Sequence, residues 1–254
     1  MASNNTPPPP SSPDSTEKLI IRRMTPPDIP TMARISCTEY FDSPLNTFLC
    51  PHRHQYPNDC LRRFVQMIRG RSLNPRSIGF VAVSASAPGI PLGYAQFIRL
   101  GNDDAAKRLV SAQASLWLSV QRWWNSLCTR IVNLVWPDRS ADPDAMRQFD
   151  ASAGADHRMF WEEGEMKVRY GERWYVQSVV VSSLYQRRGL GRMLMDEVLR
   201  RAQEDGVVVG LEASVDGEKL YRRLGFELRG RFSMNLGEVG GGVMMWSPKS
   251  VQER

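Results

Sequence analysis

The sequence predicts an α/β domain with a mixed, mostly antiparallel central sheet, helices on both of its faces and one helical insertion. Two observations carry this prediction. Short β-branched and apolar runs alternate along the chain with segments of helical periodicity. The run 207–211 is almost continuously apolar, which suits a parallel strand covered on both faces. The 254 residues, 42% of them hydrophobic, are enough for one large domain with an insertion.

The first part of the chain predicts a strand, two helices and two further strands. These are a strand at 18–24, a helix opened by Thr25 or Asp28, a helix at 59–70, and strands at 78–83 and 92–98. Gly70 is a C-cap signal for the second helix. Because Pro88-Gly89 is a turn signal, we expect the last two strands to form an antiparallel hairpin.

Residues 102–165 depart from this alternation, and we expect them to form a helical insertion between the third and fourth strands. Asn102-Asp103-Asp104 resembles a helix cap, and no proline or glycine interrupts 105–135, so one long helix or two should follow. Four of the seven tryptophans lie between 105 and 136: Trp117, Trp123, Trp124 and Trp136. We interpret its apolar stripe as a packing face; a lid over an acceptor pocket and a self-association surface, hence a homodimer, are the alternatives. Residues 137–165 are expected to be mobile.

The second part of the chain predicts four more strands and two helices. The strands are expected at 173–181, 207–212, 228–234 and 243–246, with a glycine-rich turn at 237–242. One helix follows the first of these strands directly and another follows the second. The domain is expected to span 17–248, between a disordered Pro/Ser-rich tail at 1–16 and a C-terminal tail at 249–254.

Composition narrows the classes of function and location. No apolar run approaches the roughly 20 residues that span a bilayer, and 1–16 has no secretory h-region, so we expect a cytoplasmic protein with no membrane partner. The formal charge of +6 comes from 33 basic and 27 acidic residues that are dispersed, which argues against nucleic acid as a partner. The densest basic group lies at one glycine-containing turn.

The four cysteines are expected to be reduced thiols. Cys50, His52, His54 and Cys60 would be four zinc ligands within eleven residues. Their spacing matches none of the common structural-zinc patterns, which pair cysteines or histidines two to five residues apart. We therefore expect no metal.

The stretch 179–192 predicts an anion site. It is a buried strand, a turn with Gly189 and Gly191, and a helix that begins inside the turn. The first amides of that helix have no intrahelical acceptor and lie at the positive end of its dipole. Glycine lets a ligand approach the main chain, and Arg187, Arg188 and Arg192 add positive charge. A phosphate or pyrophosphate is the expected ligand, although neither the Walker loop nor the dinucleotide fingerprint fits the spacing.

Gln186-Arg187-Arg188-Gly189-Leu190-Gly191, after a β-branched run, resembles the pyrophosphate loop Q/R-x-x-G-x-G/A of the GCN5-related N-acetyltransferase (GNAT) superfamily. About 30 residues downstream, Leu220-Tyr221 followed by Gly225-Phe226 resembles a second motif of the same superfamily. The two motifs together cover 170–235. The resemblance implies the GNAT acyl-CoA N-acyltransferase fold, with acetyl-CoA as co-substrate between two splayed parallel strands.

The resemblance also assigns roles to residues. The main chain of Val179, Val180 and Val181 would pair with the pantetheine arm, although these valines also suit a plain core strand. The segment from Arg187 to Arg192, Leu190 included, would hold the pyrophosphate. Ser214 stands where many relatives carry an asparagine that contacts the cofactor. Ser183 stands where relatives often have proline, a departure that concerns the stiffness of the loop.

Direct transfer of the acetyl group to an amine is the implied reaction. Tyr221 would be the acid that protonates the thiolate, because a phenol stays protonated at neutral pH. Glu212 is a candidate base if burial raises its pKa; a structural partner for an arginine and a chain of waters remain alternatives. Protein amino termini, lysines, polyamines and small amines all remain open as acceptors. The aromatic insertion, which could close a pocket, favours a small molecule. A non-catalytic acyl-CoA-binding module, which would have no use for Tyr221, and an interaction protein are the other readings.

Overall fold

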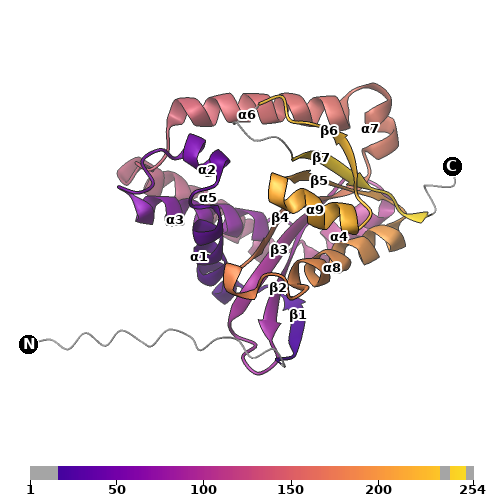
Figure 1. Ribbon diagram of the computed structural model, residues 1–254, viewed down its shortest axis with the longest axis horizontal. Coiled ribbons are helices and arrows are strands. Elements are labelled where there is room, and N and C mark those ends of the chain that lie inside the picture. The colour runs from indigo at the N-terminus through magenta and orange to yellow at the C-terminus, as the bar shows by residue number, and fades with distance from the viewer. Residues whose placement is uncertain (1–16, 235–240, 250–254) are drawn as a thin grey trace, which may run out of the picture.

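The computed structural model describes residues 17–234 and 241–249, which form one seven-stranded sheet in the order β1-β2-β3-β4-β5-β7-β6 (Figure 1). The strands are β1 (Leu19–Arg23), β2 (Ser77–Ser84), β3 (Pro91–Leu100), β4 (Arg173–Val181), β5 (Val208–Ala213), β6 (Glu227–Gly230) and β7 (Gly242–Trp246). Every neighbouring pair is antiparallel except β4 and β5. The prediction of a mixed, mostly antiparallel sheet is confirmed. The predicted tail 1–16, and most of the predicted tail 249–254 and of the turn 237–242, lie outside the described residues.

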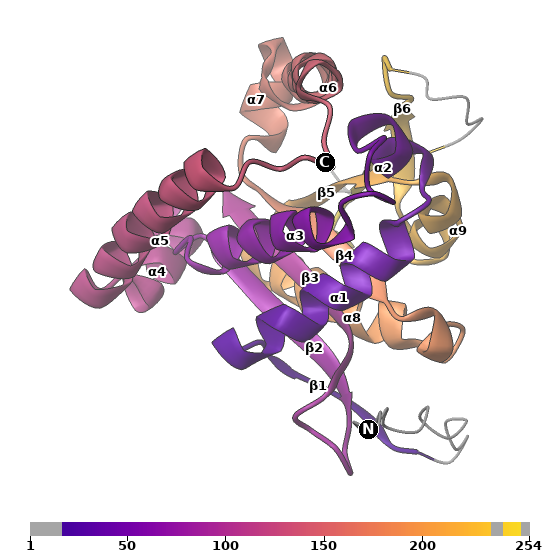
Figure 2. The ribbon, with the colours of Figure 1, turned by 90° about the vertical axis from the view of Figure 1, so that its left-hand side faces the viewer.

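Helices cover both faces of the sheet, as the sequence predicts. On one face α1 (Ile29–Tyr40) and α3 (Pro57–Ser72) pack over the strands around Met32, Ile68 and Tyr94 (Figure 2). On the other face α8 (Leu190–Asp205) and α9 (Val215–Arg223) enclose a larger core that includes Phe97 and Leu194. Burial of these apolar side chains at close packing is the main source of stability for both layers.

The boundaries of the early helices differ in part from the prediction. A 3-10 turn (Pro26–Asp28) precedes α1, and the Asp28 carboxylate accepts hydrogen bonds from the Thr25 amide at 2.7 Å and its hydroxyl at 2.9 Å. The cap at Thr25 and Asp28 is thereby confirmed. The C-cap at Gly70 is wrong, because α3 continues to Ser72. A short helix that the sequence did not predict, α2 (Pro44–Leu49), begins at Ser43, whose hydroxyl accepts from the Asn46 amide.

The insertion between β3 and β4 is helical throughout most of its length. It contains α4 (Asp104–Gln113), α5 (Leu116–Val135), α6 (Pro143–His157), a π-helical turn (Arg158–Glu162) and α7 (Gly164–Tyr170). Asp103 caps α4, as predicted, and Ser115 caps α5, so 105–135 forms two helices. The expectation of a mobile segment at 137–165 is wrong, since α6 and the π-helical turn occupy it. Trp161 on that turn is 1% exposed and packs where Gly210 of β5 leaves room for its indole ring.

One buried arginine holds both ends of the insertion. Arg99 near the end of β3 is fully buried. Its guanidinium pairs with Asp103 at the start of α4, with Glu172 just before β4 at 3.2 Å, and with Asp205 at the end of α8 at 3.3 Å. A buried cation requires such partners because desolvation of a charge is costly. The two ends of the insertion are therefore tied to one point of the core.

The expectation that the apolar stripe of 105–135 is a packing face is wrong for α5. No residue of this helix is buried, and Trp117, Trp123, Trp124 and the following Trp136 are between 59% and 68% exposed. In Figure 2 the α4–α5 hairpin projects at one margin of the molecule. No helix in the described part of the chain is both long enough and apolar enough to cross a bilayer.

Candidate active site

A gap between β4 and β5 lies at the centre of the candidate site. The two strands pair only from Arg173 to Tyr175, where Tyr175 lies opposite Gly210. The register of β4 with β3 then shifts at Gln177, and β4 continues to Val181 with β3 as its neighbour on one side. A bulge of this kind bends a strand away from its partner. The main chain on the open side of β4 is thus available for β-type pairing with a ligand.

The three valines of β4 lie along this gap. Val180 is buried in the core under α1 and α3, whereas Val179 and Val181 pack against the core on the α8 face. Their side chains therefore serve both cores, and their main chain runs beside the gap. The two interpretations from the sequence, a core strand and a pairing edge, are compatible in this geometry. Their contact with pantetheine stays a prediction.

The turn after β4 has the conformation of an anion-binding loop. A 3-10 turn (Ser183–Tyr185) leads to Arg187 and Gly189, which have positive φ angles of 64° and 84°. A side chain at position 189 would have no heavy atom within 4 Å, so the space above Gly189 is open. No side chain caps α8 among the described residues, so its first amides point at that space without an acceptor. Leu190 is buried and offers only its main chain.

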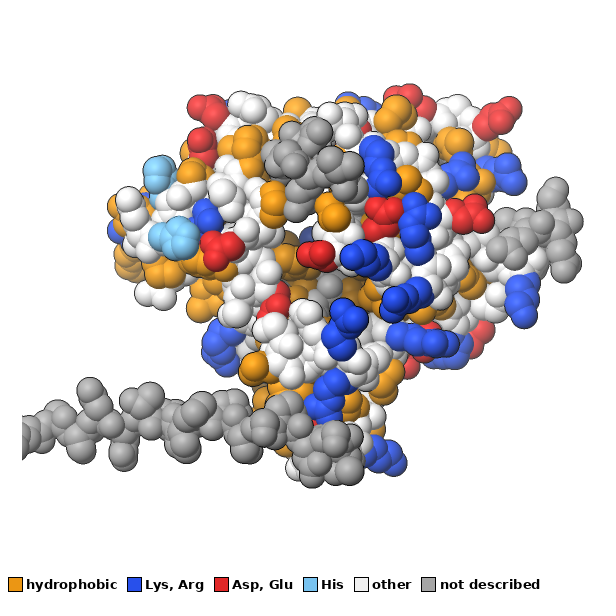
Figure 3. Space-filling view, in the orientation of Figure 1, with side chains coloured by type: hydrophobic (Ala, Val, Ile, Leu, Met, Phe, Trp, Pro, Cys, Tyr) orange, Lys and Arg blue, Asp and Glu red, His pale blue; other side chains and the backbone are white. Residues whose placement is uncertain are grey.

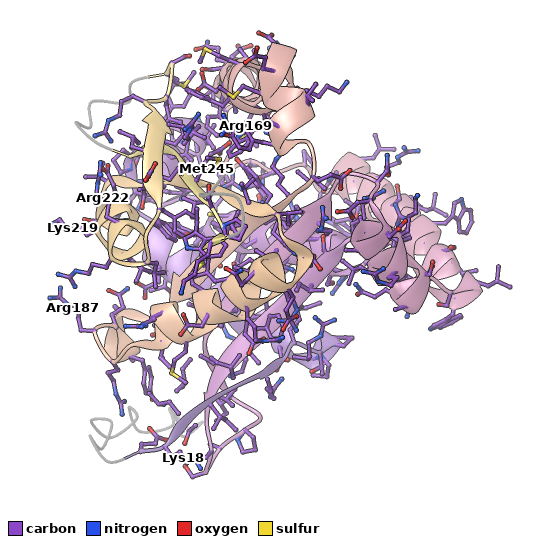
Figure 4. The ribbon with its side chains drawn as sticks, turned by 90° about the vertical axis from the view of Figure 1, so that its right-hand side faces the viewer. Lys18, Arg169, Arg187, Lys219, Arg222 and Met245 are labelled. Atoms are coloured by element: carbon purple, nitrogen blue, oxygen red, sulfur yellow. The ribbon has the colours of Figure 1, made fainter. Side chains whose placement is uncertain are left out.

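Positive charge surrounds the loop. Arg187 is exposed, Arg188 lies over the Tyr185 ring at 5.7 Å, and Arg192 is 3.9 Å from Asp196. Figure 4 shows that Lys219 and Arg222 of α9 point outward along the same edge as Arg187. The sequence analysis did not identify these two α9 residues. A signal was available in the sequence: the two basic residues are three positions apart, which places them on one side of a helix, and that helix follows the loop after one strand.

Glu39 holds the loop in place and was also missed. It lies near the end of α1, and its carboxylate accepts a hydrogen bond from the Ser183 amide at 2.8 Å and from the Gln186 side chain at 3.2 Å. Gln186 also donates to the Val181 carbonyl at 3.0 Å. The Ser183 position, where relatives often have proline, is thus restrained through its amide, which a proline would lack.

Tyr221 of α9 reaches the gap from the α8 face. Its ring is 8% exposed and packs edge-on against Phe226 at 5.7 Å. Its hydroxyl makes no hydrogen bond to any described residue. It is not fully enclosed, so it retains some access to solvent. Burial raises the pKa of Tyr221 to about 12. The phenol therefore remains a proton donor at neutral pH, as the prediction requires.

A group of polar side chains lies on the α1 side of the sheet, opposite the face that carries Tyr221. Tyr94 of β3 is buried and hydrogen-bonded to Ser36 at 2.5 Å, and burial raises its pKa. Burial is also the largest cause of the raised pKa of Tyr40. Tyr94 and Tyr221 raise the pKa of Tyr40 further. Figure 3 shows a hollow with a hydrophobic interior between the α1 side and the α9 side.

Arg71 of α3 belongs to the same group of polar side chains. Its guanidinium donates to the Ser178 hydroxyl at 2.7 Å and to the Gln177 carbonyl at 3.1 Å, beside the bulge of β4. Burial lowers the pKa of Arg71, and no described carboxylate pairs with it. Most buried arginines have an acidic partner. Arg71 is thus a half-buried positive charge that has no carboxylate partner among the described residues.

Glu212 does not have the environment that the sequence analysis expected. It lies on β5 at the edge of the gap, but its side chain is exposed, so the expected burial is wrong. The Tyr175 hydroxyl donates to its carboxylate at 3.0 Å, and the pKa of Tyr175 is raised, first by burial and then by Glu212. Glu212 is exposed because β4 has already turned away where β5 reaches this residue. Its role as a base stays a prediction.

Ser214 has a structural task in this state. Its hydroxyl caps α9 and accepts from the Gly217 amide at 3.2 Å. Such a cap stabilises a helix by roughly 1 kcal/mol. A contact with the cofactor stays a prediction.

Two other parts of the molecule contribute nothing to this site. No three histidine, cysteine or acidic side chains of the described residues come together as metal ligands, so Cys50, His52, His54 and Cys60 do not form such a cluster. A groove of about 450 Å³ lies between α3 and α5, with Arg122 as its one ionisable side chain. It contains no residue of the loop or of the gap.

Comparison with known proteins gives matches for both the sequence and the fold. The sequence model of the acetyltransferase (GNAT) family matches residues 117–226, a range that includes the loop and Tyr221. An acetyltransferase of Stachybotrys chartarum (strain CBS 109288 / IBT 7711) is 26% identical over 212 residues, which are 80% of this chain and 78% of the relative.

Two solved structures are similar to this chain, and the first of them supports the likeness of the fold. The crystal structure described as histone acetyltransferase HPA2 and related acetyltransferase, from Corynebacterium glutamicum, is 18% identical. The match covers 91% of this chain and 96% of that one, with a TM-score of 0.55. An acetyltransferase of Clostridium acetobutylicum solved with acetyl-CoA is 12% identical over 86% of this chain and 97% of that chain, with a TM-score of 0.45. The family match over residues 117–226, together with the sheet described above, confirms the predicted resemblance to the GNAT acetyltransferases, which are acyltransferases.

Proposed function

We propose that this protein transfers an acetyl group from acetyl-CoA directly to the primary amine of a small molecule. The proposal rests on one observation: the start of α8, which has no side-chain cap and is flanked by arginines, and the buried phenol of Tyr221 both lie beside the β4–β5 gap. The GNAT family uses acetyl-CoA, and the residues present fit that molecule. The amides at the start of α8 suit its pyrophosphate, and the open edge of β4 suits its amide-containing arm.

Acetyl-CoA supplies a thioester, which is an activated acyl group. The main chain of Val179 to Val181 orients the arm along β4, and Arg187 and Arg192 neutralise phosphate charge. Tyr221, which is protonated at neutral pH, donates its phenolic proton to the departing sulfur. Glu212, on the acceptor side of the gap, accepts the proton that the ammonium must lose, directly or through water. The neutral amine then attacks the thioester carbonyl, so that a C–N bond forms as the C–S bond breaks.

The group of polar side chains on the α1 side favours a particular acceptor chemistry. Arg71 offers a positive charge without a described carboxylate partner. The phenols of Tyr40 and Tyr94 add hydrogen-bonding groups, since their raised pKa values keep them protonated. A primary amine that also carries a carboxylate would place its anion at Arg71 and its nitrogen in the gap. We therefore expect amino acids to be better acceptors than the matching amides.

Tyr221→Phe tests the enzyme against a non-catalytic binding module. We expect calorimetry to show acetyl-CoA binding within about twofold of wild type, and release of coenzyme A with an amine panel to fall at least 100-fold. Tyr170→Phe, which alters a buried tyrosine of α7 away from the gap, is the matched control. Failure of wild type to bind acetyl-CoA would overturn the proposal. Binding without turnover of any amine would favour the module.

The acceptor preference is tested with Arg71→Met. The panel pairs each amino acid with its amide, and Arg69→Met on the exposed side of α3 is the control. We expect kcat/KM for the acid to exceed that for the amide by about tenfold in wild type and in the control, and the preference to vanish in Arg71→Met. Equal turnover of acids and amides by wild type would refute this acceptor class and leave the acetyltransferase proposal standing.

A further inference from the structure

Helix α5 exposes its main apolar stripe and turns a mixed side toward the protein, where Leu118, Gln121, Asn125, Cys128 and Val132 are half-buried. Arg122 lies on a third side of the helix and is exposed. The groove that it forms with α3 is lined by Ser119, Arg122, Asn125 and Ser126, with Trp123 at its edge. Asn133 accepts a hydrogen bond from Gln66 of α3 at 3.0 Å. A surface helix of a globular protein normally has the opposite orientation, with its apolar stripe inward. The apolar face of α5 is therefore directed away from the rest of the chain.

That outward face is long and continuous. Its exposed members recur at spacings of three and four residues, which places them on one side of a helix of about 30 Å in length. They are Leu116, Trp117, Val120, Trp123, Trp124, Ile131, Leu134 and Val135, followed by Trp136, and each is at least 51% exposed. Contiguous apolar surface of this extent marks an interaction site in a soluble domain. We call this set the α5 face.

Charge distinguishes between the surfaces that could cover the α5 face. No aspartate or glutamate occurs from 105 to 137, whereas Lys107, Arg108, Arg122 and Arg130 do. A second copy packed through the same face would bring like charges together, because a twofold interface pairs a patch with itself. Anionic lipid headgroups complement this charge, and each basic residue near them contributes about 1 kcal/mol.

The side chains of the α5 face fit the same surface. Tryptophan combines a large apolar ring with an N–H donor, and such residues collect at the boundary between headgroups and acyl chains. A helix with tryptophan and leucine on one side and arginine beside them lies in the plane of that boundary. Such binding requires that the helix contact the membrane surface, and not that it span the bilayer. This proposal departs from the expectation of no membrane partner, which rested on the absence of an apolar run long enough to span a bilayer.

We propose that the α5 face docks this enzyme on an anionic membrane surface. Helix α5 lies parallel to the bilayer, Trp117, Trp123 and Trp124 enter the headgroup region, and Arg122 and Arg130 reach the phosphates. No residue of the α5 face belongs to β4 or β5, so docking through this face does not occupy the residues of the gap. The inference is independent of the acceptor and of the proposed reaction.

Vesicle flotation tests the proposal with the full-length protein. The probes are vesicles of phosphatidylcholine alone and vesicles with about 30 mol% phosphatidylserine. We expect wild type to bind the anionic vesicles at least tenfold more strongly, and high salt to weaken that binding. The triple variant Trp117→Ser, Trp123→Ser, Trp124→Ser should lose at least tenfold. Val168→Ser, which alters an exposed apolar residue on α7, should bind as wild type does.

Two further measurements keep the result interpretable. The thermal unfolding midpoint of the triple variant should match that of wild type, because no α5 residue is buried. Arg122→Gln with Arg130→Gln should reduce binding to anionic vesicles and leave the weak binding to neutral ones unchanged. Absence of wild-type flotation with anionic vesicles, or equal flotation of the triple variant, would overturn the proposal. A dimer in light scattering that the triple variant abolishes, without vesicle binding, would assign the face to a second copy instead.

Discussion

Arginine serves opposite purposes in two regions of this molecule. Arg99 is fully buried, and three carboxylates from three elements surround it. The arginines of the β4–α8 loop lie at the surface, where Arg187 has no ion pair with a described residue and Arg192 has a long contact of 3.9 Å with Asp196. Arg99 has its anions supplied by the fold itself. The loop presents charge and open amides to an anion that the chain does not contain.

The difference separates structural charge from binding charge. A buried ion network is satisfied internally, so its removal should change stability and leave ligand affinity alone. A loop whose donors are unsatisfied should show the reverse pattern. Arg71 is an intermediate case, since it is half-buried and, like Arg187, has no carboxylate partner among the described residues.

Replacement of Arg99 should have the largest effect on the free energy of unfolding. Arg99→Met leaves Asp103, Glu172 and Asp205 without their common cation, and loss of one member of a buried ion network costs roughly 3 to 5 kcal/mol. Urea denaturation measures the change. Arg200→Met, which alters an exposed ion pair of α8, should cost less than about 1 kcal/mol. A loss at Arg99 no larger than that at Arg200 would refute the structural assignment.

Substitution of the two glycines that flank α8 should separate binding from stability. Gly189 and Gly206 have φ angles of 84° and 66°, and both have open space where a Cβ would stand. Alanine in this conformation costs about 1 kcal/mol at either site. Gly189→Ala should in addition weaken acetyl-CoA binding at least tenfold in calorimetry, because its Cβ enters the space above the amides. Gly206→Ala should bind normally. Equal affinities for the two variants would contradict the location of the anion site.

The parts of the fold that the sequence predicted are those specified locally. The loop and its helix follow from glycine conformation and helix ends within a few residues, and the strands follow from apolar runs. The short helix α2 was missed because six residues carry too little periodicity. Glu212 was expected to be buried because its neighbours on β5 are apolar, but the bulge at Gln177 that exposes it lies on another strand.

Arrangements between distant segments could not be predicted. Tyr40, Arg71 and Tyr94 come from three elements, and only the packing of α1 and α3 on β3 brings them together. The apolar stripe of α5 was visible in the sequence, yet periodicity shows that a helix has an apolar side and not what that side faces. An inward and an outward stripe have the same pattern. The direction depends on which side of α5 packs against α3.

Removal of Glu39 should have a smaller effect that reports on the loop alone. Glu39→Ala removes two hydrogen bonds to the Ser183 amide and the Gln186 side chain. Each such bond contributes about 1 kcal/mol when formed, and part of this is regained when a ligand orders the loop. We expect the Kd for acetyl-CoA to rise about three- to tenfold with kcat unchanged at saturation. Glu204→Ala, at the other end of α8, is the control; if it weakened binding as much, Glu39 would have no special role.

The smallest expected change in unfolding free energy concerns a carboxylate that forms ion pairs with two arginines beside the site. Glu218 of α9 pairs with Arg222 and Arg231 at 2.7 Å and accepts from the Gly241 amide, which lowers its pKa to about 2, with the Arg231 hydrogen bond as the largest cause. Because the folded-state pKa lies below the unfolded value of about 4.5, this group contributes stability above pH 4.5 and loses it as the pH falls toward 2. The unfolding free energy of wild type should exceed that of Glu218→Gln by about 1 kcal/mol at pH 7, and the difference should shrink below pH 4.5. A difference in unfolding free energy that does not change with pH would mean that the packing of Glu218, and not its charge, stabilises the contact between α9 and β7. Arg222 would then be assigned to ligand binding, together with the arginines of the loop.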